Sequence, residues 1–472
     1  NPTVALLSTL ATFAAGFVVR PFGALVFGRL GDRTGRKYTF LLTLVIMGLS
    51  TFLIGCIPSY TSIGFAAPVL VLILRLLQGL ALGGEYGGAA TYVAEHAPPE
   101  RRGFWTSWIQ TTATAGLFIS LLVIILTRSV LDETSFNDWG WRIPFWISII
   151  MVAISIVIRM KMQESPMFKK VKAEGALSVN PLKESFGNKL NFKFVLLALF
   201  GATMGQGVVW YTGQFYALNF IQTTLHIEIA QASKLIMIAL LLGTPFFVVF
   251  GALSDKVGRK WIMMIGMLVA LLTYRPIYSA MYRAGSVTQK TEIPSSRQIY
   301  KTENFSVESG DPVARIDSIV EYTDGSTKTV SNKTTIPKNG KQQTVTSIVT
   351  TLGTGSFWKL VLLVFVQVIY VTMVYGPIAA FLVEMFPTRI RYTSMSLPYH
   401  IGNGIFGGLL PAIATFLATK AQQANDAALN AGLPVPYEKP FLEGLWYPII
   451  LAAVSFVIGV VYINGKDNRI DD

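Results

Sequence analysis

The sequence is poor in cysteine and in charged residues. It has one cysteine, Cys56, in 472 residues, which excludes a scaffold held together by disulfides. Only 14% of its residues are charged, whereas a soluble domain has about 25%. The apolar fraction of 52% excludes an intrinsically disordered chain. Because the apolar residues form long runs without alternation, we expect a helical integral membrane protein rather than a β-barrel.

The signatures of several enzyme classes are also missing. There is no G-x-x-x-x-G-K-[ST] loop for ATP hydrolysis and no G-x-S-x-G nucleophile elbow. The three histidines, His96, His226 and His400, lack the spacing of a metal site. We therefore predict that the protein is not an enzyme and that it holds no metal.

Eleven apolar segments are long enough to span a bilayer, which takes about 20 helical residues. Lys and Arg lie between these segments, above all in 159–193, whereas the loop 58–67 has neither. Basic loops remain in the cytoplasm, so we expect a multi-pass protein of the cell (inner or plasma) membrane. The same rule explains the net charge of +13, so we predict no nucleic-acid partner. The segments are 4–30, 38–57, 68–94, 104–127, 141–159, 194–222, 232–253, 261–282, 357–385, 392–418 and 441–463.

Two stretches of the sequence repeat. Residues 28–37 (GRLGDRTGRK) reappear as residues 251–260 (GALSDKVGRK), and 95–102 (EHAPPERR) is matched more weakly by 384–391 (EMFPTRIR). The repeat predicts two halves of similar topology. In transporters built from paired halves, the substrate lies between them near the middle of the bilayer.

A polar insertion interrupts the second half. Residues 283–355 are rich in Thr, Ser and Lys and contain no spanning segment, and the topology places them outside the cell. Residues 319–330 read as a β-hairpin around Asp324-Gly325. We expect either a small β-rich external cap or a loop without fixed structure.

Four motifs carry a resemblance to a known family. Residues 28–37 have every fixed position of the loop signature G-x-L-x-D-R-x-G-R-K, and three further motifs are RLLQG (75–79), GGEYG (83–87) and WGWRIP (139–144). The sequence thereby resembles the major facilitator superfamily. Within it, it is similar to the metabolite:proton symporters, which include permeases for α-ketoglutarate, shikimate, citrate and proline or betaine. The resemblance covers nearly the whole chain except the insertion.

The resemblance implies an all-α major facilitator fold of two six-helix halves, a monomer, and protons as the coupling ion without another cofactor. The signature loop lies between helices 2 and 3 of the family. We therefore expect the first segment to be helix 2, and helix 1 to be missing from this chain. The predicted parts are 1–160 (helices 2–6), 161–193 (cytoplasmic linker), 194–282 (helices 7–9), 283–355 (external insertion), 356–464 (helices 10–12) and 465–472 (cytoplasmic tail).

The signature loops are predicted to form a gate at the cytoplasmic side. Gly28 and Gly35 allow close approach and tight turning, and Asp32 can accept hydrogen bonds from the N–H groups at the start of a neighbouring helix. The alternative is ordinary anchoring of basic loops with solvated helix ends. The gate residues implied by the resemblance are Gly28, Asp32, Arg33, Gly35, Arg36, Glu95, Arg102, Asp255, Arg259, Glu384 and Arg391.

Two charged residues are expected deep in the membrane. Arg20 and Glu85 each lie ten residues from a helix end, which is about 15 Å, and buried charges at that depth indicate function. Arg20 would bind a substrate carboxylate, or it would pair permanently with Glu85 or with a backbone carbonyl. Glu85 would be a protonatable coupling group, or a member of the same ion pair.

Further polar and aromatic residues near the midplane complete the predicted site, although each alone also fits helix packing. The substrate-binding candidates are Arg20, Glu85, Tyr86, Gln206, Trp210, Tyr211, Tyr375 and Asn403. The coupling candidates are Arg75, Glu85 and His400, because histidine titrates near neutral pH and the motif of Arg75 is implicated in coupling by resemblance.

We therefore expect a secondary transporter that imports a small organic acid with protons by alternating access, with the solute and the lipid bilayer as its partners. A first alternative is a zwitterion such as proline or betaine, whose ammonium group would enter an aromatic cage of Trp210, Tyr211 and Tyr375. The sequence is also compatible with a membrane sensor or receptor that uses the insertion, and with a proton-driven exporter.

Overall fold

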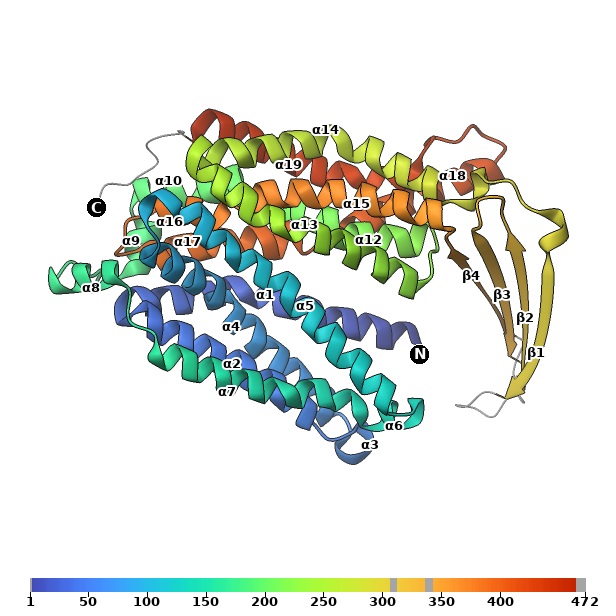
Figure 1. Ribbon diagram of the computed structural model, residues 1–472, viewed down its shortest axis with the longest axis horizontal. Coiled ribbons are helices and arrows are strands. Elements are labelled where there is room, and N and C mark those ends of the chain that lie inside the picture. The colour runs from blue at the N-terminus through green and yellow to red at the C-terminus, as the bar shows by residue number, and fades with distance from the viewer. Residues whose placement is uncertain (1, 306–311, 336–342, 464–472) are drawn as a thin grey trace.

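The computed structural model describes residues 2–305, 312–335 and 343–463, and it describes the side chains of the first helix from Gly16 onward. Two bundles of long helices lie along the longest axis of the molecule. Their ribbons approach each other at one end and diverge toward the other, where a β-sheet projects from the second bundle (Figure 1).

The first bundle contains five long helices. Because their apolar residues are continuous, each buries one side against its neighbours and leaves the other for lipid. These helices are α1 (Pro2–Thr34), α2 (Arg36–Cys56), α4 (Ala66–His96), α5 (Arg102–Val130) and α7 (Ile143–Lys161), with the short α3 (Tyr60–Ile63), η1 (Pro99–Arg101), α6 (Glu133–Asp138) and η2 (Gly140–Arg142) between them. The short α8 (Pro166–Ala173) and α9 (Pro181–Gly187) connect the bundles.

The second bundle has six spanning stretches, two of which are interrupted by π-helical turns. The first is formed by α10 (Lys189–Ala198), η3 (Leu199–Thr203), α11 (Met204–Tyr211), η4 (Thr212–Tyr216), α12 (Ala217–Asn219) and η5 (Phe220–Thr224). The next are α13 (Ile229–Val257), α14 (Arg259–Gly285) and the pair α15 (Thr354–Tyr375) with α16 (Ile378–Met385). The last two are α17 (Arg391–His400), η8 (Ile401–Gly407) and α18 (Leu410–Asn430), and then η9 (Pro440–Leu445) and α19 (Trp446–Tyr462).

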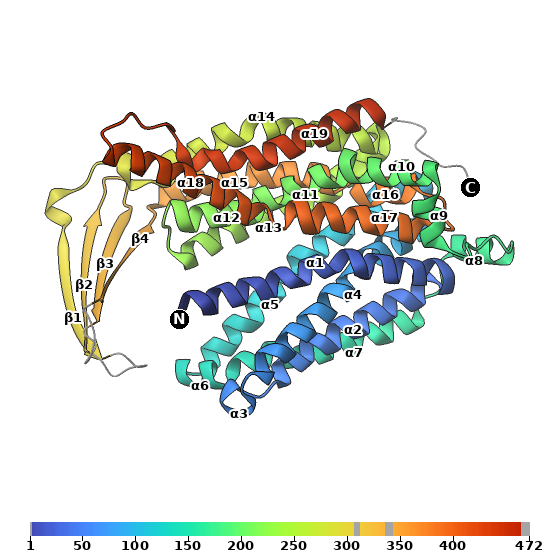
Figure 2. The same cartoon turned by 180° about the vertical axis from the view of Figure 1, so that it is seen from behind.

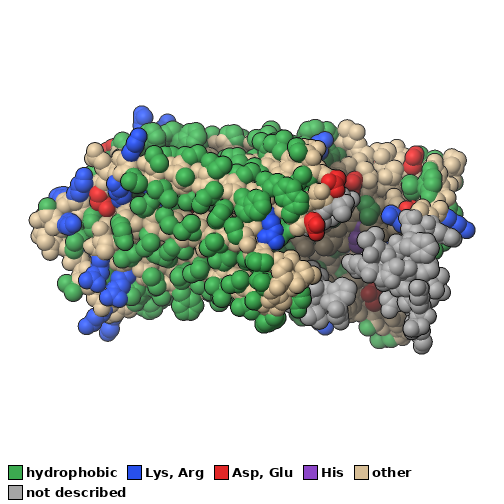
Figure 3. All heavy atoms as spheres, turned by 90° about the horizontal axis from the view of Figure 1, so that it is seen from below, with side chains coloured by type: hydrophobic (Ala, Val, Ile, Leu, Met, Phe, Trp, Pro, Cys, Tyr) green, Lys and Arg blue, Asp and Glu red, His purple; other side chains and the backbone are tan. Residues whose placement is uncertain are grey.

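The helical membrane fold predicted from the sequence is confirmed. Ten helical stretches in the described chain are long and apolar enough to cross a membrane, and they coincide with ten of the eleven predicted segments. The eleventh segment, 4–30, lies within the 33-residue helix α1. Hydrophobic side chains cover the middle of the face shown in Figure 3, as contact with lipid requires.

The two ends of the bundles differ in charge. Lys and Arg gather at the end where α1 meets α2 and where α8 and α9 lie, and we call this the basic end (Figures 1 and 3). The opposite end carries the β-sheet, and we call it the sheet end. Which end faces the cytoplasm stays a prediction from the charge pattern. The predicted tail 465–472 lies outside the described residues.

The insertion forms a four-stranded antiparallel sheet with strand order β1-β2-β3-β4. The predicted hairpin around Asp324-Gly325 is confirmed, because β2 and β3 pair from Glu321 and Thr327 outward and Gly325 has a φ of 78°. Only glycine adopts this angle without strain. The strands are β1 (Gln298–Phe305), β2 (Pro312–Glu321), β3 (Thr327–Thr335) and β4 (Gln343–Thr351), preceded by η6 (Val287–Gln289) and η7 (Pro294–Ser296).

The base of the sheet is bonded to the second bundle. The N–H of Thr350 on β4 donates to the carbonyl of His226 (2.7 Å), and the N–H of Glu228 donates to the carbonyl of Thr350 (2.9 Å). Asp324 in the hairpin turn pairs with Lys290 (2.7 Å) and accepts a hydrogen bond from Ser356 at the start of α15 (2.7 Å). These contacts fix the sheet to the helices that precede and follow it.

The pKa of Asp324 reflects this attachment. Partial burial of the carboxyl would raise the pKa, but hydrogen bonds from Lys290, Ser356 and Ser326 outweigh burial and hold the pKa below its ordinary value. A carboxylate with a lowered pKa in the folded state stabilises the fold fully above its unfolded pKa, about 3.9. This stabilisation is lost as the pH falls from there through the lowered pKa.

We therefore predict that Asp324→Ala loosens the base of the sheet. The amide of Ser326 loses its acceptor on Asp324 (3.0 Å), so its hydrogen exchange at pH 7 should accelerate about tenfold or more, as expected when about 1.4 kcal/mol of protection is lost. The control is Asp317→Ala, because Asp317 pairs with Arg315 on the exposed part of β2. Equal exchange at Ser326 in wild type and Asp324→Ala would contradict the role of this carboxylate.

Candidate functional site

The aspartates of the two signature loops bond across the two bundles at the basic end. Asp32, near the end of α1, accepts hydrogen bonds from the N–H groups of Tyr392 (3.2 Å) and Thr393 (2.8 Å) in the first turn of α17. Asp255, near the end of α13, accepts them from Gly103 and Phe104 in the first turn of α5, both at 2.8 Å. Each aspartate thus caps a helix of the opposite bundle, where carboxylates are favoured. The bond expected for Asp32 is confirmed.

The arginine that follows each aspartate repeats the same contacts. Arg36 is fully buried and bonds the carboxylate of Asp32 and the carbonyl of Gly31, both at 2.8 Å. Arg259 bonds the carboxylate of Asp255 (2.7 Å) and the carbonyl of Ser254 (2.9 Å). The repeat seen in the sequence is therefore a repeat of side-chain geometry.

Two ion pairs connect the bundles beside these caps. Glu95 of α4 pairs with Arg391 of α17 (2.9 Å) and lies 3.6 Å from Arg36. Glu384 of α16 pairs with Arg259 (3.0 Å) and lies 4.0 Å from Arg102 of α5. Removing one partner of a buried pair costs about 3–5 kcal/mol.

The glycines and Arg33 of the first signature loop have different environments. A methyl group on Gly28 would lie 2.8 Å from the Cα of Thr393, so this glycine is needed for close approach of α1 and α17. Gly35 has a φ of 126°, which favours glycine. Arg33 is exposed, so the structure does not bury it with Asp32 and Arg36.

Tyr392 inserts its ring from α17 into the first bundle. A methyl group on Gly31 would overlap this ring, one on Gly87 would lie 2.8 Å from the ring and one on Gly88 would lie 2.6 Å from the hydroxyl oxygen. The hydroxyl donates to the carbonyl of Gly84 (2.5 Å). We call Gly31, Gly84, Gly87 and Gly88 the glycine slot. A fully buried ring held on several sides by backbone joins the bundles as firmly as the charged groups do.

An aromatic cluster lies between the bundles around Arg20 of α1. The guanidinium of Arg20 hydrogen-bonds Tyr211 of α11, lies over the ring of Phe17 (4.0 Å) and interacts electrostatically with tyrosines of the second bundle. Tyr86 of α4 stacks on Tyr399 of α17 with 3.6 Å between ring centroids. We call the following residues the central cluster: Arg20, Tyr86, Trp210, Tyr211, Tyr375 and Tyr399.

Contacts within the central cluster join α11, α15 and α17. Tyr375 and Tyr399 share a hydrogen bond between their hydroxyls, and the rings of Trp210 and Tyr375 are 6.0 Å apart. Trp210 and Tyr211 pack edge to face at 4.7 Å. The structure therefore brings together five of the predicted substrate-binding residues, Arg20, Tyr86, Trp210, Tyr211 and Tyr375.

Gln206 and Asn403 form a reciprocal amide pair. Gln206 donates to Asn403 at 3.1 Å, and Asn403 donates back at 2.9 Å. Both side chains are buried, Gln206 directly after the π-helical turn η3 and Asn403 within the π-helical turn η8. Such turns are frequent at functional sites because they redirect side chains.

The ion pair between Arg20 and Glu85, which the sequence left open, is not formed. Glu85 lies 3.7 Å from Arg159 of α7, and Arg159 also bonds the carbonyl of Phe40 and lies over its ring. In the described part of the chain, the electrostatic partners of Arg20 are tyrosines and His400, with no carboxylate among them.

The remaining coupling candidates have distinct neighbours. Arg75 donates to Gln78 (3.3 Å), which donates to Thr51 of α2 (2.7 Å), so Arg75 belongs to a polar contact between α4 and α2. His400 is buried next to the ring of Tyr399, and its Nε2 has no hydrogen-bond partner within the described residues. No group of acidic, histidine or cysteine side chains with the geometry of a metal site occurs among the residues described.

Comparison with known proteins identifies the family. Residues 1–283 match the family model of the Major Facilitator Superfamily. The chain belongs to this superfamily. It is 36% identical over 292 residues to the proline/betaine transporter of Escherichia coli K12, a match that covers 59% of this chain and 57% of that transporter. The chain is also 28% identical over its whole length to the α-ketoglutarate permease of the same strain, with 87% of the permease covered.

Solved structures show the same fold. The proton:xylose symporter XylE bound to 6-bromo-6-deoxy-D-glucose has a TM-score of 0.63 and 15% identity, and the match covers 99% of this chain and 89% of that chain. A likeness at this identity establishes the major facilitator fold, the two bundles being its halves.

Several residues of this superfamily member escaped the sequence-based prediction. Glu164, in the connection after α7, accepts hydrogen bonds from the N–H groups of Arg36 (3.1 Å) and Lys37 (3.3 Å) and so caps α2. Ser165 bonds Glu95, and the carbonyl of Thr388 accepts from Arg36 (2.6 Å). For Tyr392, the sequence did hold a signal, since the glycines of 83–88 require a partner that needs their space.

We predict that filling the glycine slot destabilises the closed basic end and that trimming Tyr392 relieves this effect. Gly88→Ala should lower stability by about 1–3 kcal/mol, because its methyl group overpacks against the Tyr392 hydroxyl. Tyr392→Phe should cost about 0.5–1.5 kcal/mol for the lost hydrogen bond. The double variant should be more stable than the sum of both effects, measured by thermal unfolding of the purified chain in detergent.

The control for this cycle is Gly116→Ala, because a methyl group on this glycine of α5 meets nothing within 4 Å. Additive effects of Gly88→Ala and Tyr392→Phe would show that the hydroxyl and the glycine do not compete for the same space.

Proposed function

We propose that the protein is a proton-coupled symporter that imports a small solute bearing a carboxylate, by alternating access between its two bundles. The observation that carries the proposal is the position of Arg20. Its guanidinium lies in the central cluster between the bundles and has a tyrosine hydroxyl as its partner. A carboxylate of a solute binds an arginine more strongly than a neutral hydroxyl does.

The basic end is the cytoplasmic gate in this proposal, and the sheet end is external. Lys and Arg gather at the basic end, and cytoplasmic loops are rich in these residues. The caps of Asp32 and Asp255, the ion pairs of Glu95 and Glu384, and Tyr392 in its slot hold this end shut. Entry of the solute into the cytoplasm requires that these contacts break together.

A small organic acid is the first candidate for the solute. The match to the α-ketoglutarate permease over the whole chain supports it. An organic acid with one carboxylate is satisfied by Arg20, and the hydroxyls of Tyr211 and Tyr375 would serve as further donors. A proton carried by the protein balances the charge of the acid.

A zwitterion such as proline or betaine is the second candidate, and the composition of the cluster favours it. The central cluster combines one guanidinium with rings of Trp210, Tyr211 and Tyr375, whose centroids lie 4.7 to 6.0 Å from each other where they contact Trp210. A carboxylate would bind Arg20, and an ammonium group would face the rings. The match to the proline/betaine transporter covers 57% of that protein, so the match supports this candidate only for part of the fold.

Two groups compete for the role of proton carrier. Glu85 already has a cationic partner, Arg159. His400 is buried within electrostatic range of Arg20, so a solute carboxylate on Arg20 would favour the protonated imidazole. We therefore favour His400, with Glu85 as the alternative.

We predict that Arg20→Gln abolishes most uptake. Uptake of α-ketoglutarate, citrate, shikimate, proline and betaine is measured in proteoliposomes with an imposed proton gradient. Loss of a charge-assisted pair of about 1.5–3 kcal/mol should raise the KM of the transported solute about 10–150-fold. Arg29→Gln is the control, because Arg29 is an exposed arginine of the same helix.

The proposal fails if a folded protein takes up a solute equally well with Arg20→Gln, or if uptake ignores the proton gradient. Loss of uptake in both Arg20→Gln and Arg29→Gln would point to damage of α1 rather than to a carboxylate anchor.

A further inference from the structure

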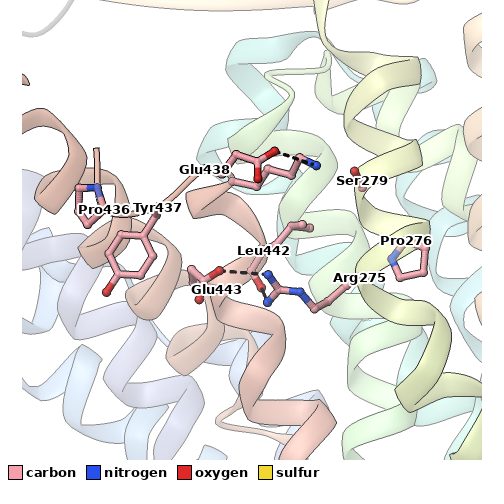
Figure 4. Close-up of a pocket in the computed structure, with 9 residues that line it drawn as sticks. Arg275, Pro276, Ser279, Pro436, Tyr437, Glu438, Leu442 and Glu443 are labelled. Carbon is pink, nitrogen blue, oxygen red and sulfur yellow. Dashed lines mark hydrogen bonds and ion pairs between the residues drawn. The ribbon is translucent and has the colours of Figure 1, made fainter. Parts of the chain in front are cut away.

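A pocket lies at the sheet end of the second bundle, away from the central cluster. Its volume is about 440 Å³, and its walls are α14, the loop 436–439 and η9 (Figure 4). This size is in the range of small-molecule sites, about 300–1,000 Å³. The pocket is lined by Arg275, Pro276, Ser279, Pro436, Tyr437, Glu438, Lys439, Leu442 and Glu443.

The walls of the pocket are fixed by hydrogen bonds. The buried Asn425 of α18 donates to the carbonyl of Tyr437 (2.7 Å) and accepts from its N–H (3.0 Å), which holds the loop in place. Arg275 donates to the carbonyl of Leu442 (3.3 Å) and to Glu443 (3.2 Å), which ties η9 to α14.

The pocket carries charges of both signs. Arg275 and Glu443 form one pair inside it, and Lys439 and Glu438 form a second, more exposed pair at 3.3 Å. Figure 4 shows the two pairs on opposite sides of Leu442. A ligand with one positive and one negative group matches this arrangement, whereas an anion alone leaves the two carboxylates unpaired.

The position of the pocket indicates a ligand from the membrane. Arg275 lies sixteen residues into α14, about 24 Å from the basic end of the helix, which is close to the edge of a hydrocarbon layer of about 30 Å. Its guanidinium lies over the ring of Trp446 (4.8 Å) at the start of α19. Trp446 is exposed, and tryptophan is enriched at the level of the lipid headgroups.

Apolar surface continues from the pocket toward the middle of the membrane. Leu272 lies one turn from Arg275 on α14 and Ile450 one turn from Trp446 on α19, and both are more than half exposed. The two helices are in contact and run side by side along the outside of the second bundle (Figures 1 and 2). Acyl chains have an apolar track there below a polar pocket.

Pro276 adds a further acceptor at this level. Proline has no N–H group, so the carbonyl of Leu272 loses its usual donor in the helix. Together with Glu443 and Glu438, this carbonyl favours a ligand that donates several hydrogen bonds. A primary ammonium group donates three, and a trimethylammonium group donates none.

We infer that this pocket binds the headgroup of a zwitterionic phospholipid with a primary amine, phosphatidylethanolamine, from the leaflet at the sheet end. The phosphate accepts hydrogen bonds from Arg275 and Lys439. The ammonium group donates to Glu443, Glu438 and the carbonyl of Leu272. This site does not depend on which solute the central cluster takes.

The test is native mass spectrometry of the delipidated full chain in detergent, titrated with dioleoyl phosphatidylethanolamine, phosphatidylcholine and phosphatidylglycerol. We expect one equivalent of phosphatidylethanolamine to bind at least about fivefold more tightly than phosphatidylcholine, a ratio typical of one well-made polar contact. Arg275→Met and Glu443→Gln should each abolish this preference. The control is Lys170→Gln with Glu174→Gln, which removes an exposed ion pair at the basic end.

Three results would overturn the proposal. Equal binding of the three lipids, preference for phosphatidylglycerol, or an unchanged preference in both pocket variants would each contradict it. Soluble glycerophosphoethanolamine and inorganic phosphate are tested alongside, and binding of either as tight as that of the lipid would assign the pocket to a free solute.

Because Arg275→Met removes a structural bond, a second variant covers the case of misfolding. Glu438→Gln with Lys439→Gln changes only the more exposed pair and should weaken the preference about threefold, as expected for partly exposed charges. No weakening in this folded variant would contradict the predicted role of the outer pair.

Discussion

The capping of each bundle by an aspartate of the other is the contact on which the closed basic end depends. A carboxylate at a helix N-terminus satisfies N–H groups that have no partner within their own helix. If Asp32 or Asp255 moved away, two buried N–H groups and a buried arginine would lose their acceptors at once. The same aspartates therefore align α17 against α1 and α5 against α13, and the ion pairs of Glu95 and Glu384 form only when this alignment exists.

The lock is symmetric in its charges but not in its packing. Arg102 and Arg391 occupy matching places in the two halves, yet the next residue is Gly103 in one and Tyr392 in the other. A methyl group on Gly103 would overlap the carbonyl of Gly251, so backbone meets backbone there. On the other side, the ring of Tyr392 fills a slot made by four glycines. Opening the Tyr392 side therefore exposes an aromatic ring and an empty slot, whereas opening the Gly103 side separates two flat surfaces.

The sequence predicted those parts of the structure that local patterns encode. The spanning segments follow from apolar runs, the hairpin from Asp324-Gly325, and the cap of Asp32 from the signature loop. The depth of Arg20 and Glu85 was read from residue counts, but counts along a helix do not give the direction in which a side chain points. Arg20 faces the second half and Glu85 faces Arg159 of its own half. Contacts such as Glu164 with the start of α2 depend on how distant segments meet, which one sequence does not reveal.

Three deeply placed arginines show why one of them is suited to bind a solute. Arg36 is held by Asp32 and lies 3.6 Å from Glu95, and Arg159 lies 3.7 Å from Glu85. A solute carboxylate at either position would have to displace a carboxylate of the protein and would gain nothing in charge. Arg20 is bonded to the neutral hydroxyl of Tyr211. Exchange of that hydroxyl for a carboxylate turns a neutral acceptor into a charged one, and charge-assisted hydrogen bonds are about twice as strong. The difference between these partners, rather than the depth of the residue, makes Arg20 the anchor and leaves Arg36 and Arg159 to hold the fold.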